Sequence, residues 1–358
     1  MTERVDRRRL PVLVVSGFLG SGKTTLLRKV LTGEKMARSL VLVNEAAEIG
    51  VDDRVLRTRG GQTVRLLGNG CLCCAIEEDL RRVLLDVVDD PAVLGGIDRI
   101  VIETSGLADP VSAIATLAAH PRLACVLRLQ AVVTVVDVLQ AAEQLRDFAE
   151  FASQVESADV LVLSKADLAS SDALEQAWRR LESMNPLASS HDARSPDIGR
   201  DLADAGSRFL SDRAVRQWSF EPQRDAAGKV HHTTGVEAFG IRIRKPIDWI
   251  GFTTWFSLLL HAHGRDLLRV KGIVSFDDGV SPVLVNSVRH VVHPPEHLPE
   301  WPDEDRSMFL VFVVRDLRPQ DVLRSMERFL GTAPDDCTLV SPRIRSSATA
   351  TTIARSGG

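Results

Sequence analysis

The sequence lacks long hydrophobic runs and has few cysteines for its length. No stretch reaches the roughly 18 consecutive apolar residues of a membrane-spanning helix. Five cysteines in 358 residues are too few and too clustered for a disulfide framework. Three of them lie within the segment 71–74, which favours a metal or redox site in a reducing compartment. The cytoplasm is therefore the expected location, with no membrane partner.

The chain also lacks a surplus of positive charge. It has 44 Lys and Arg residues and 48 Asp and Glu residues, which gives a formal net charge of −4. This charge argues against a general nucleic-acid binder. The basic N-terminus is followed by the short apolar run Leu10–Val15, which has no cleavage site and leads into a glycine-rich loop. This run is therefore predicted to be a first strand rather than part of a signal peptide.

Apolar runs and helical patterns alternate in the first half, which predicts an α/β domain. Its mostly parallel sheet would be covered by helices on both faces. The helix Lys23–Leu31 is predicted to stop at Gly33. The expected strands are Val12–Ser16, Leu40–Asn44, Ile100–Glu103, Ala131–Asp137 and Val160–Ser164.

The second half has a different, α+β pattern. Residues 178–211 are polar and predicted to be helical, and a smaller domain is expected to begin near Trp218. Its predicted strands are Val236–Arg244, Leu268–Phe276 and Met308–Val314, and its predicted helices are Pro246–His263 and Pro319–Leu330. The segment after Pro342 is rich in Ser, Thr, Ala and Arg. We therefore expect a nucleotide-binding domain at 1–215, a C-terminal domain at 216–332 and a flexible tail at 333–358.

The segment Gly17–Thr24 reads GFLGSGKT and fits the phosphate-binding loop pattern. Its glycines would let backbone N–H groups surround a phosphate, while Lys23 reaches the β and γ phosphates. The hydroxyl of Thr24 would bind Mg²⁺. The alternative is a glycine-rich turn that binds nothing. The predicted nucleotide contacts in this loop are Gly17, Gly20, Ser21, Gly22, Lys23, Thr24 and Thr25.

The segment IVIETSGLADP follows, with Glu103 at the end of a predicted strand. This carboxylate would hold Mg²⁺ or position water, so Glu103 and Lys23 are the candidate catalytic residues. The N–H of Gly106 would sense the γ-phosphate. The alternative is a strand end followed by a helix cap, since Ser105 and Asp109 are good capping residues.

A second nucleotide-binding motif, SKAD, follows the run Val160–Leu163. GTPases usually have N-K-x-D here, in which the Asp accepts two hydrogen bonds from guanine. Lys165 would pack over the base and Asp167 would read it, while Ser164 replaces the usual Asn. A surface turn is the alternative. The acidic loop Asn44–Asp53 has the position of a switch loop near Mg²⁺.

The segment GCLCC brings together Cys71, Cys73 and Cys74, whose thiolates would bind Zn²⁺, Cu⁺ or Co²⁺. A tetrahedral site needs one more ligand, which Glu45, Glu48, a histidine or water would supply. A redox pair and buried apolar cysteines are the alternatives. The isolated Cys125 and Cys337 are expected to be structural, and the pair His231–His232 to be a surface feature.

Together with DLLRVKGIV and VNSVRHVVHPP, these motifs resemble the CobW-type metallochaperone GTPases. The resemblance runs from about Leu10 to Leu330. It implies a GTPase domain, a CobW-like C-terminal domain, and delivery of zinc, with cobalt or iron as alternatives, to a client metalloprotein. It also implies that the three clustered cysteines bind the metal, with GTP/GDP and Mg²⁺ as cofactors. The oligomeric state is left open, a homodimer included.

The chain departs from the family pattern in the switch loop and in the base motif. Ala46-Ala47 replaces the usual Phe-Gly, which is expected to change how the switch loop moves and docks. Ser164 replaces the usual Asn, which is expected to lower the affinity for guanine. Three further functions stay open. One is a dedicated activator of a single metalloenzyme, such as nitrile hydratase, or of cobalamin synthesis. The other two are a metal- or redox-sensing binding module and a P-loop phosphotransferase.

Overall fold

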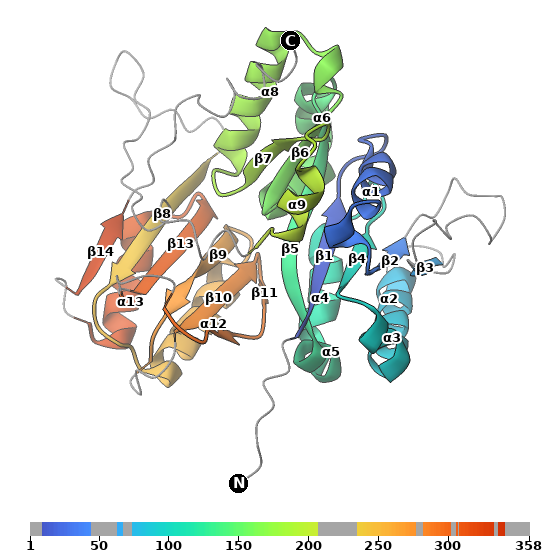
Figure 1. The fold of residues 1–358 in the computed structure, drawn as a ribbon. Coiled ribbons are helices and arrows are strands. Elements are labelled where there is room, and N and C mark those ends of the chain that lie inside the picture. The colour runs from blue at the N-terminus through green and yellow to red at the C-terminus, as the bar shows by residue number, and fades with distance from the viewer. Residues whose placement is uncertain are drawn as a thin grey trace. The chain divides into compact units, whose positions relative to one another are not determined.

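Two separate β-sheets organise the chain in this computed structural model (Figure 1). The structure describes residues 9–43, 63–66, 74–206, 235–276, 282–301, 306, 308–332 and 336–340. The first unit consists of Met1–Gln154, Ala158–Lys165 and Ser190–Ala205. The second unit consists of Val155–Ser157, Ala166–Ser189 and Gly206–Gly358.

The first sheet confirms the predicted α/β architecture. In spatial order its strands are β3 (Thr63–Leu66), β2 (Ser39–Val43), β4 (Arg99–Glu103), β1 (Leu10–Ser16), β5 (Leu127–Asp137), β6 (Val160–Ser164) and β7 (Ser189–Asp192). The neighbouring strands from β3 to β6 all run parallel, and Figure 1 shows β1 between β4 and β5. The carboxyl ends of these parallel strands lie at one edge of the sheet, where α/β proteins bind ligands.

Helices cover both faces of the first sheet because alternate side chains of a strand point to opposite faces. On one face α1 (Lys23–Leu31) and α9 (Ile198–Ala203) share a core with Leu13 and Val15 of β1. The oppositely directed Val12 and Val14 are fully buried, and α4 (Pro110–Ala119) packs against β1 and β5. The remaining elements of this half are η1 (Glu34–Met36), α2 (Cys74–Val88), α3 (Pro91–Gly96), α5 (Pro121–Val126), α6 (Ala141–Asp147) and α7 (Ala149–Ser157).

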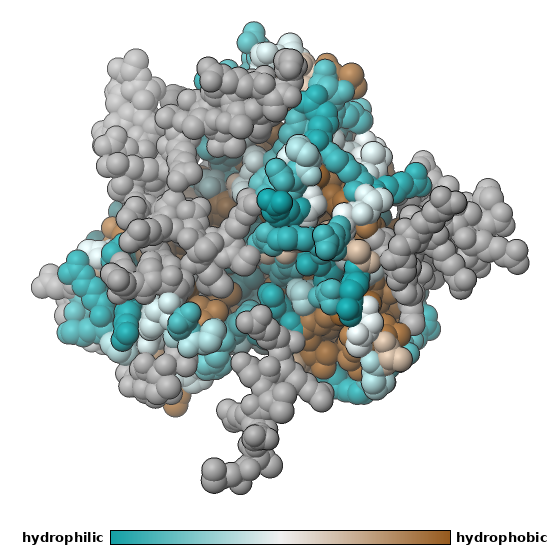
Figure 2. Space-filling model, viewed as in Figure 1, coloured by the Kyte–Doolittle hydropathy of each residue, from teal (hydrophilic) through white to brown (hydrophobic). Residues whose placement is uncertain are grey.

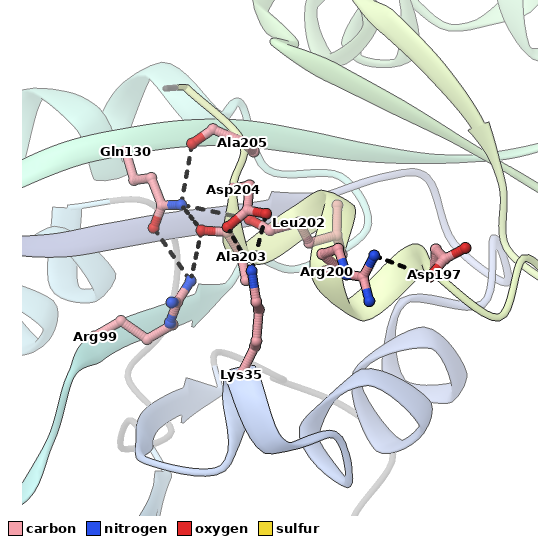
Figure 3. A network of polar contacts seen from close by, with 9 residues as sticks. All are labelled: Lys35, Arg99, Gln130, Asp197, Arg200, Leu202, Ala203, Asp204 and Ala205. Atoms are coloured by element: carbon pink, nitrogen blue, oxygen red, sulfur yellow. Dashed lines mark hydrogen bonds and ion pairs between the residues drawn. The ribbon is translucent and has the colours of Figure 1, made fainter. Parts of the chain in front are cut away.

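A polar network around the buried Gln130 fixes the C-terminal end of α9 (Figure 3). The Gln130 side-chain nitrogen donates to the carbonyl oxygens of Ala203 at 2.7 Å and Ala205 at 3.0 Å. Arg99 also donates to the Ala203 carbonyl, at 3.3 Å, while Lys35 forms an ion pair with Asp204. Gln130 and Arg99 thus satisfy carbonyl groups that a helix end leaves without partners.

The second sheet is antiparallel, as an α+β domain requires. Its order is β11 (Val291–Val292), β10 (Val283–Val288), β9 (Leu267–Val274), β13 (Met308–Arg315), β8 (Val236–Ile243) and β14 (Cys337–Val340), with β12 (Glu296–His297) paired to β10. The helices α12 (Trp249–His263) and α13 (Pro319–Leu330) pack on one face of this sheet. Its core includes Phe239 and Phe312, whose stacked rings lie 5.0 Å apart.

The structure differs from the predictions for the second half of the chain at three places. Residues 178–211 are predicted to be helical, which α8 (Ser171–Met184) and α9 confirm, but the prediction is wrong between them, where β7 interrupts the helices. Likewise α12 begins at Trp249 rather than Pro246, since Asp248 caps it by accepting from the Gly251 N–H. The second sheet also extends into the predicted tail, because Cys337–Val340 pairs with β8. The remaining short element is η2 (Ala166–Leu168).

Most of the described surface seen in Figure 2 is polar, with an apolar area over α4 and α5. Within the described residues, no helix combines the length and apolarity that crossing a membrane requires.

Candidate functional site

The phosphate loop Gly17–Thr24 connects β1 to α1 at the carboxyl edge of the first sheet. Three of its glycines have positive φ, at 142° for Gly17, 70° for Gly20 and 95° for Gly22. A Cβ on Gly17 would lie 2.4 Å from the Val135 carbonyl oxygen, so no larger residue fits there. Glycine therefore lets the loop wrap closely before α1, whose N-terminal end favours an anion.

The Lys23 ammonium lies across this loop. Its Nζ donates to the carbonyl oxygens of Gly17 at 2.8 Å and Phe18 at 3.2 Å. These two bonds hold the cation beside the backbone that is predicted to surround the phosphates. The structure therefore places Lys23 where a phosphate-binding lysine is needed, while its contact with nucleotide stays a prediction.

Thr24 and Glu103 lie side by side although they are far apart in the sequence. The Thr24 hydroxyl donates to Glu103 Oε1 at 2.9 Å. Glu103 ends β4 and is 4% exposed. A hydroxyl and a carboxylate provide the oxygen ligands that Mg²⁺ prefers, so these two residues fit the predicted magnesium site.

The segment after Glu103 packs against the phosphate loop. A Cβ on Gly106 would lie 2.7 Å from the Leu19 backbone nitrogen and 2.8 Å from its Cα. The backbone at Gly106 therefore touches the phosphate loop directly, which a γ-phosphate sensor requires. The alternative interpretation of this segment, a strand end followed by a helix cap, is confirmed for Asp109 but not for Ser105, because Asp109 accepts from the Val111 N–H at 3.0 Å and caps α4.

The SKAD motif also contacts the phosphate loop, through Ser164. Its hydroxyl lies 2.7 Å from the Ser21 carbonyl oxygen and 3.2 Å from that of Val136. The serine thus joins β6 to the phosphate loop despite being shorter than the usual asparagine. The effect of this substitution on guanine affinity stays a prediction.

The two residues of this motif that are predicted to contact guanine, Lys165 and Asp167, differ in their surroundings. Lys165, at a positive φ of 56°, forms an ion pair of 2.5 Å with the buried carboxylate of Asp137. Asp167 lies in η2, and its side chain is exposed to solvent, as a base-reading carboxylate must be. Thr25, in the first turn of α1, is likewise exposed.

The predicted zinc ligands fall largely outside the described residues. This holds for Cys71, Cys73 and the switch loop Asn44–Asp53, which includes Glu45 and Glu48, and for His231–His232. For Cys74 the backbone begins α2, but its side chain is outside the described part. In the part of the chain that the structure does describe, no three His, Cys, Asp or Glu side chains are grouped to hold a metal ion.

The two isolated cysteines differ from each other. Cys337 is buried in the core of the second unit, where desolvation raises the pKa of its thiol, as expected for a structural residue. Cys125 lies exposed on α5, so packing gives no reason for it there.

Sequence reasoning missed two residues next to this site, Asp137 and Gln154. Asp137 ends β5 at the same sheet edge as Glu103, so the strand pattern could have identified it. Gln154 lies within α7, and its side chain donates to the carbonyls of Gly106 and Ala108. No local pattern marks a glutamine in mid-helix, so this contact could not be predicted.

The parallel sheet, the glycine-rich loop and the Thr24–Glu103 pair define a P-loop nucleotide-binding protein. The family model for the CobW/HypB/UreG nucleotide-binding domain matches residues 11–192, and that for the cobalamin synthesis protein cobW C-terminal domain matches residues 236–330. The chain therefore belongs to the CobW/HypB/UreG family.

Named relatives and a solved structure agree with this membership. The chain is 31% identical to the zinc chaperone YjiA of Escherichia coli, over 88% of this chain and 97% of that protein. It is 27% identical to zinc-regulated GTPase metalloprotein activator 1 of Schizosaccharomyces pombe, over 88% and 82%. The crystal structure of Zn(II)-bound YjiA GTPase from E. coli matches with a TM-score of 0.64 and 27% identity, covering 90% of this chain and 99% of that one.

Proposed function

We propose that the protein is a GTP-hydrolysing metal chaperone that binds zinc through Cys71, Cys73 and Cys74 and transfers it to a client metalloprotein. The observation that carries the nucleotide part is the 2.9 Å hydrogen bond from Thr24 to Glu103 beneath the phosphate loop. The relatives named as zinc chaperones and the three clustered cysteines support the metal part.

In this proposal, different described residues bind different parts of the nucleotide. Lys23 pairs with the β and γ phosphates, while Lys165 and Asp167 select guanine at the opposite end of the nucleotide. Thr24 and Glu103 hold Mg²⁺, which when bound offsets the phosphate charge during attack by water. Hydrolysis releases GDP and inorganic phosphate.

Zinc is the cargo in this proposal rather than a resident cofactor. It binds cysteine as the thiolate, so its uptake releases protons and weakens at low pH. Three protein thiolates leave one position of a tetrahedral ion for another ligand, which lets a client ligand enter during transfer. GTP changes zinc affinity by ordering the switch loop Asn44–Asp53, about twenty residues before the cysteines.

Zinc affinity in defined nucleotide states tests the proposal. The reduced protein competes with a chromophoric chelator without nucleotide, with GDP and Mg²⁺, and with a non-hydrolysable GTP analogue and Mg²⁺. We expect at least a tenfold difference between states, about 1.4 kcal/mol of coupling. The triple variant Cys71→Ser, Cys73→Ser, Cys74→Ser should lose tight binding. The matched control is Cys125→Ser, which removes an exposed cysteine from α5.

Other outcomes identify the competing functions. Unchanged zinc affinity in the triple variant would show that the ligand assignment is wrong. Tight zinc binding that ignores nucleotide, and that persists unchanged in Lys23→Ala, would favour a sensing module. GDP formation that depends strictly on a second small substrate would identify a phosphotransferase.

A further inference from the structure

Gln154 is buried beside the predicted γ-phosphate sensor. Its side chain is 0% exposed, and its Nε2 donates to the carbonyl oxygens of Gly106 at 3.0 Å and Ala108 at 3.1 Å. The Gln154 backbone carbonyl in turn accepts from the Thr134 hydroxyl of β5 at 2.8 Å. The glutamine is thus tied to the sheet by its backbone and to the loop by its side chain.

These contacts fix the orientation of two peptide groups. Both partners of Nε2 are carbonyl oxygens, so the nitrogen must face them and the amide orientation is determined. A peptide group is planar and trans, so holding the Gly106 carbonyl also sets the direction of the Leu107 N–H. The Gly106 N–H belongs to the preceding peptide, whose Ser105 carbonyl accepts from the Ala108 N–H at 3.1 Å, so Gln154 acts on it through the segment and not directly. Since Gly106 itself touches Leu19, the amide also sets how this segment meets the phosphate loop.

The oxygen of the Gln154 amide, Oε1, lacks the hydrogen bonds that the nitrogen makes. Gln154 Oε1 is buried and has no hydrogen-bond partner among the described residues. A buried polar atom without a partner is unfavourable and calls for an explanation. If a peptide of the segment turned over, its N–H would face Nε2, so Oε1 could accept from it only after the Gln154 amide had also rotated by 180°.

We propose that Gln154 is a positioning residue for GTP hydrolysis, whose amide holds the segment 104–109 in the orientation that reads the γ-phosphate. The inference rests on the proposed GTPase function and adds a residue that does not itself touch the nucleotide. Its role is specific to GTP, because GDP lacks the phosphate that this segment would contact.

The experiment compares Gln154→Met with Gln144→Met. Both glutamines are buried and lie on the consecutive helices α6 and α7, but among the described residues the Gln144 side chain bonds only to Gln140. Hydrolysis is followed at saturating GTP and Mg²⁺, and affinities are measured for GDP and for a non-hydrolysable GTP analogue. We expect Gln154→Met to lower kcat at least tenfold and to weaken the analogue, while its GDP affinity stays within twofold of Gln144→Met.

A third variant, Gln154→Glu, keeps the shape of the side chain. An ionised carboxylate would repel the two carbonyls, whereas a protonated one donates a single hydrogen bond. Its hydrolysis rate relative to the unsubstituted protein should therefore recover as pH falls, while that of Gln154→Met should not. This variant also serves if methionine is not tolerated at the site.

Several results would overturn the inference. One is a kcat for Gln154→Met within twofold of the control. Another is an equal loss of GDP and analogue affinity together with a lower melting temperature, which would make Gln154 merely structural. If the unsubstituted protein hydrolyses no GTP, the proposed function fails instead, so the two failures are distinguishable.

Discussion

Replacing Gly106 with alanine tests whether the contact between the segment 104–109 and the phosphate loop matters. The added Cβ would lie 2.6 Å from Leu19 Cδ2, 2.7 Å from its nitrogen and 2.8 Å from its Cα. The Leu19 side chain is 56% exposed and can turn away, but the two backbone atoms cannot. Because ordinary contacts begin near 3.4 Å, the two segments must separate by about 0.7 Å to relieve the contact with the Leu19 nitrogen.

The size of the effect follows from this overlap. The φ of Gly106 lies outside the left-handed region, so alanine adds no backbone strain and the effect is steric. Overpacking of this kind typically costs about 1–3 kcal/mol, which would lower the melting temperature by about 2–10 °C. If the segment moves aside instead, stability is kept and hydrolysis of GTP falls, since the sensor no longer touches the phosphate loop.

The assay combines thermal unfolding with GTP turnover. The control is Gly95→Ala, because a Cβ at this position in α3 meets nothing within 4 Å. Alanine there should leave turnover unchanged and stability equal or slightly higher, since glycine is the poorer helix former. Stability and turnover of Gly106→Ala both matching those of Gly95→Ala would refute the close packing described above.

Three further substitutions give distinct outcomes. Thr24→Val should raise the Mg²⁺ concentration needed for hydrolysis at least tenfold, measured by magnesium titration of turnover, because it removes one of two oxygen ligands. Lys165→Met leaves the buried Asp137 carboxylate without its ion pair, so unfolding in urea should show a loss of about 1–3 kcal/mol that Asp137→Asn in the same chain partly restores. Desolvation raises the pKa of Glu182 in α8 to about 7 from its ordinary value of 4.5. The folded protein therefore binds more protons than the unfolded chain in that window, and stability falls as pH rises from 4.5 to 7. Glu182→Gln should remove this fall, a gain at pH 8 of about 1–2 kcal/mol after allowance for partial exposure, measured by urea unfolding at pH 5 and pH 8.

The elements that sequence predicted well carry strong local signals. The helix Lys23–Leu31 has the predicted bounds because a glycine-rich loop precedes it and Gly33 follows it. The buried strand β6 also matches, since a continuous apolar run between polar turns is typical of a parallel strand. By contrast, β7 reads SSHD and has no hydrophobic alternation, so only its pairing in three dimensions identifies it as a strand.

The candidate site shows the same division between local and tertiary information. The placement of Thr24 next to Glu103 was predictable, because both follow parallel strands whose carboxyl ends share one edge. The contact of Gln154 with the segment 104–109 was not, since it depends on how α7 packs. Sequence motifs thus identify residues that would touch the nucleotide, but not the residues that hold those residues in place.

Three residues each contact the phosphate loop at a separate point: one ends β4, one lies in the segment that follows β4, and one ends β6. Glu103 accepts from Thr24, Gly106 touches Leu19, and Ser164 bonds to the Ser21 carbonyl. A change in any one contact therefore acts first on the backbone that is predicted to hold the phosphates. The three points nevertheless differ in their predicted ligands: magnesium at Glu103, the third phosphate at Gly106 and the base next to Ser164. Discrimination of GTP from GDP should thus depend on the first two contacts and leave the third unaffected.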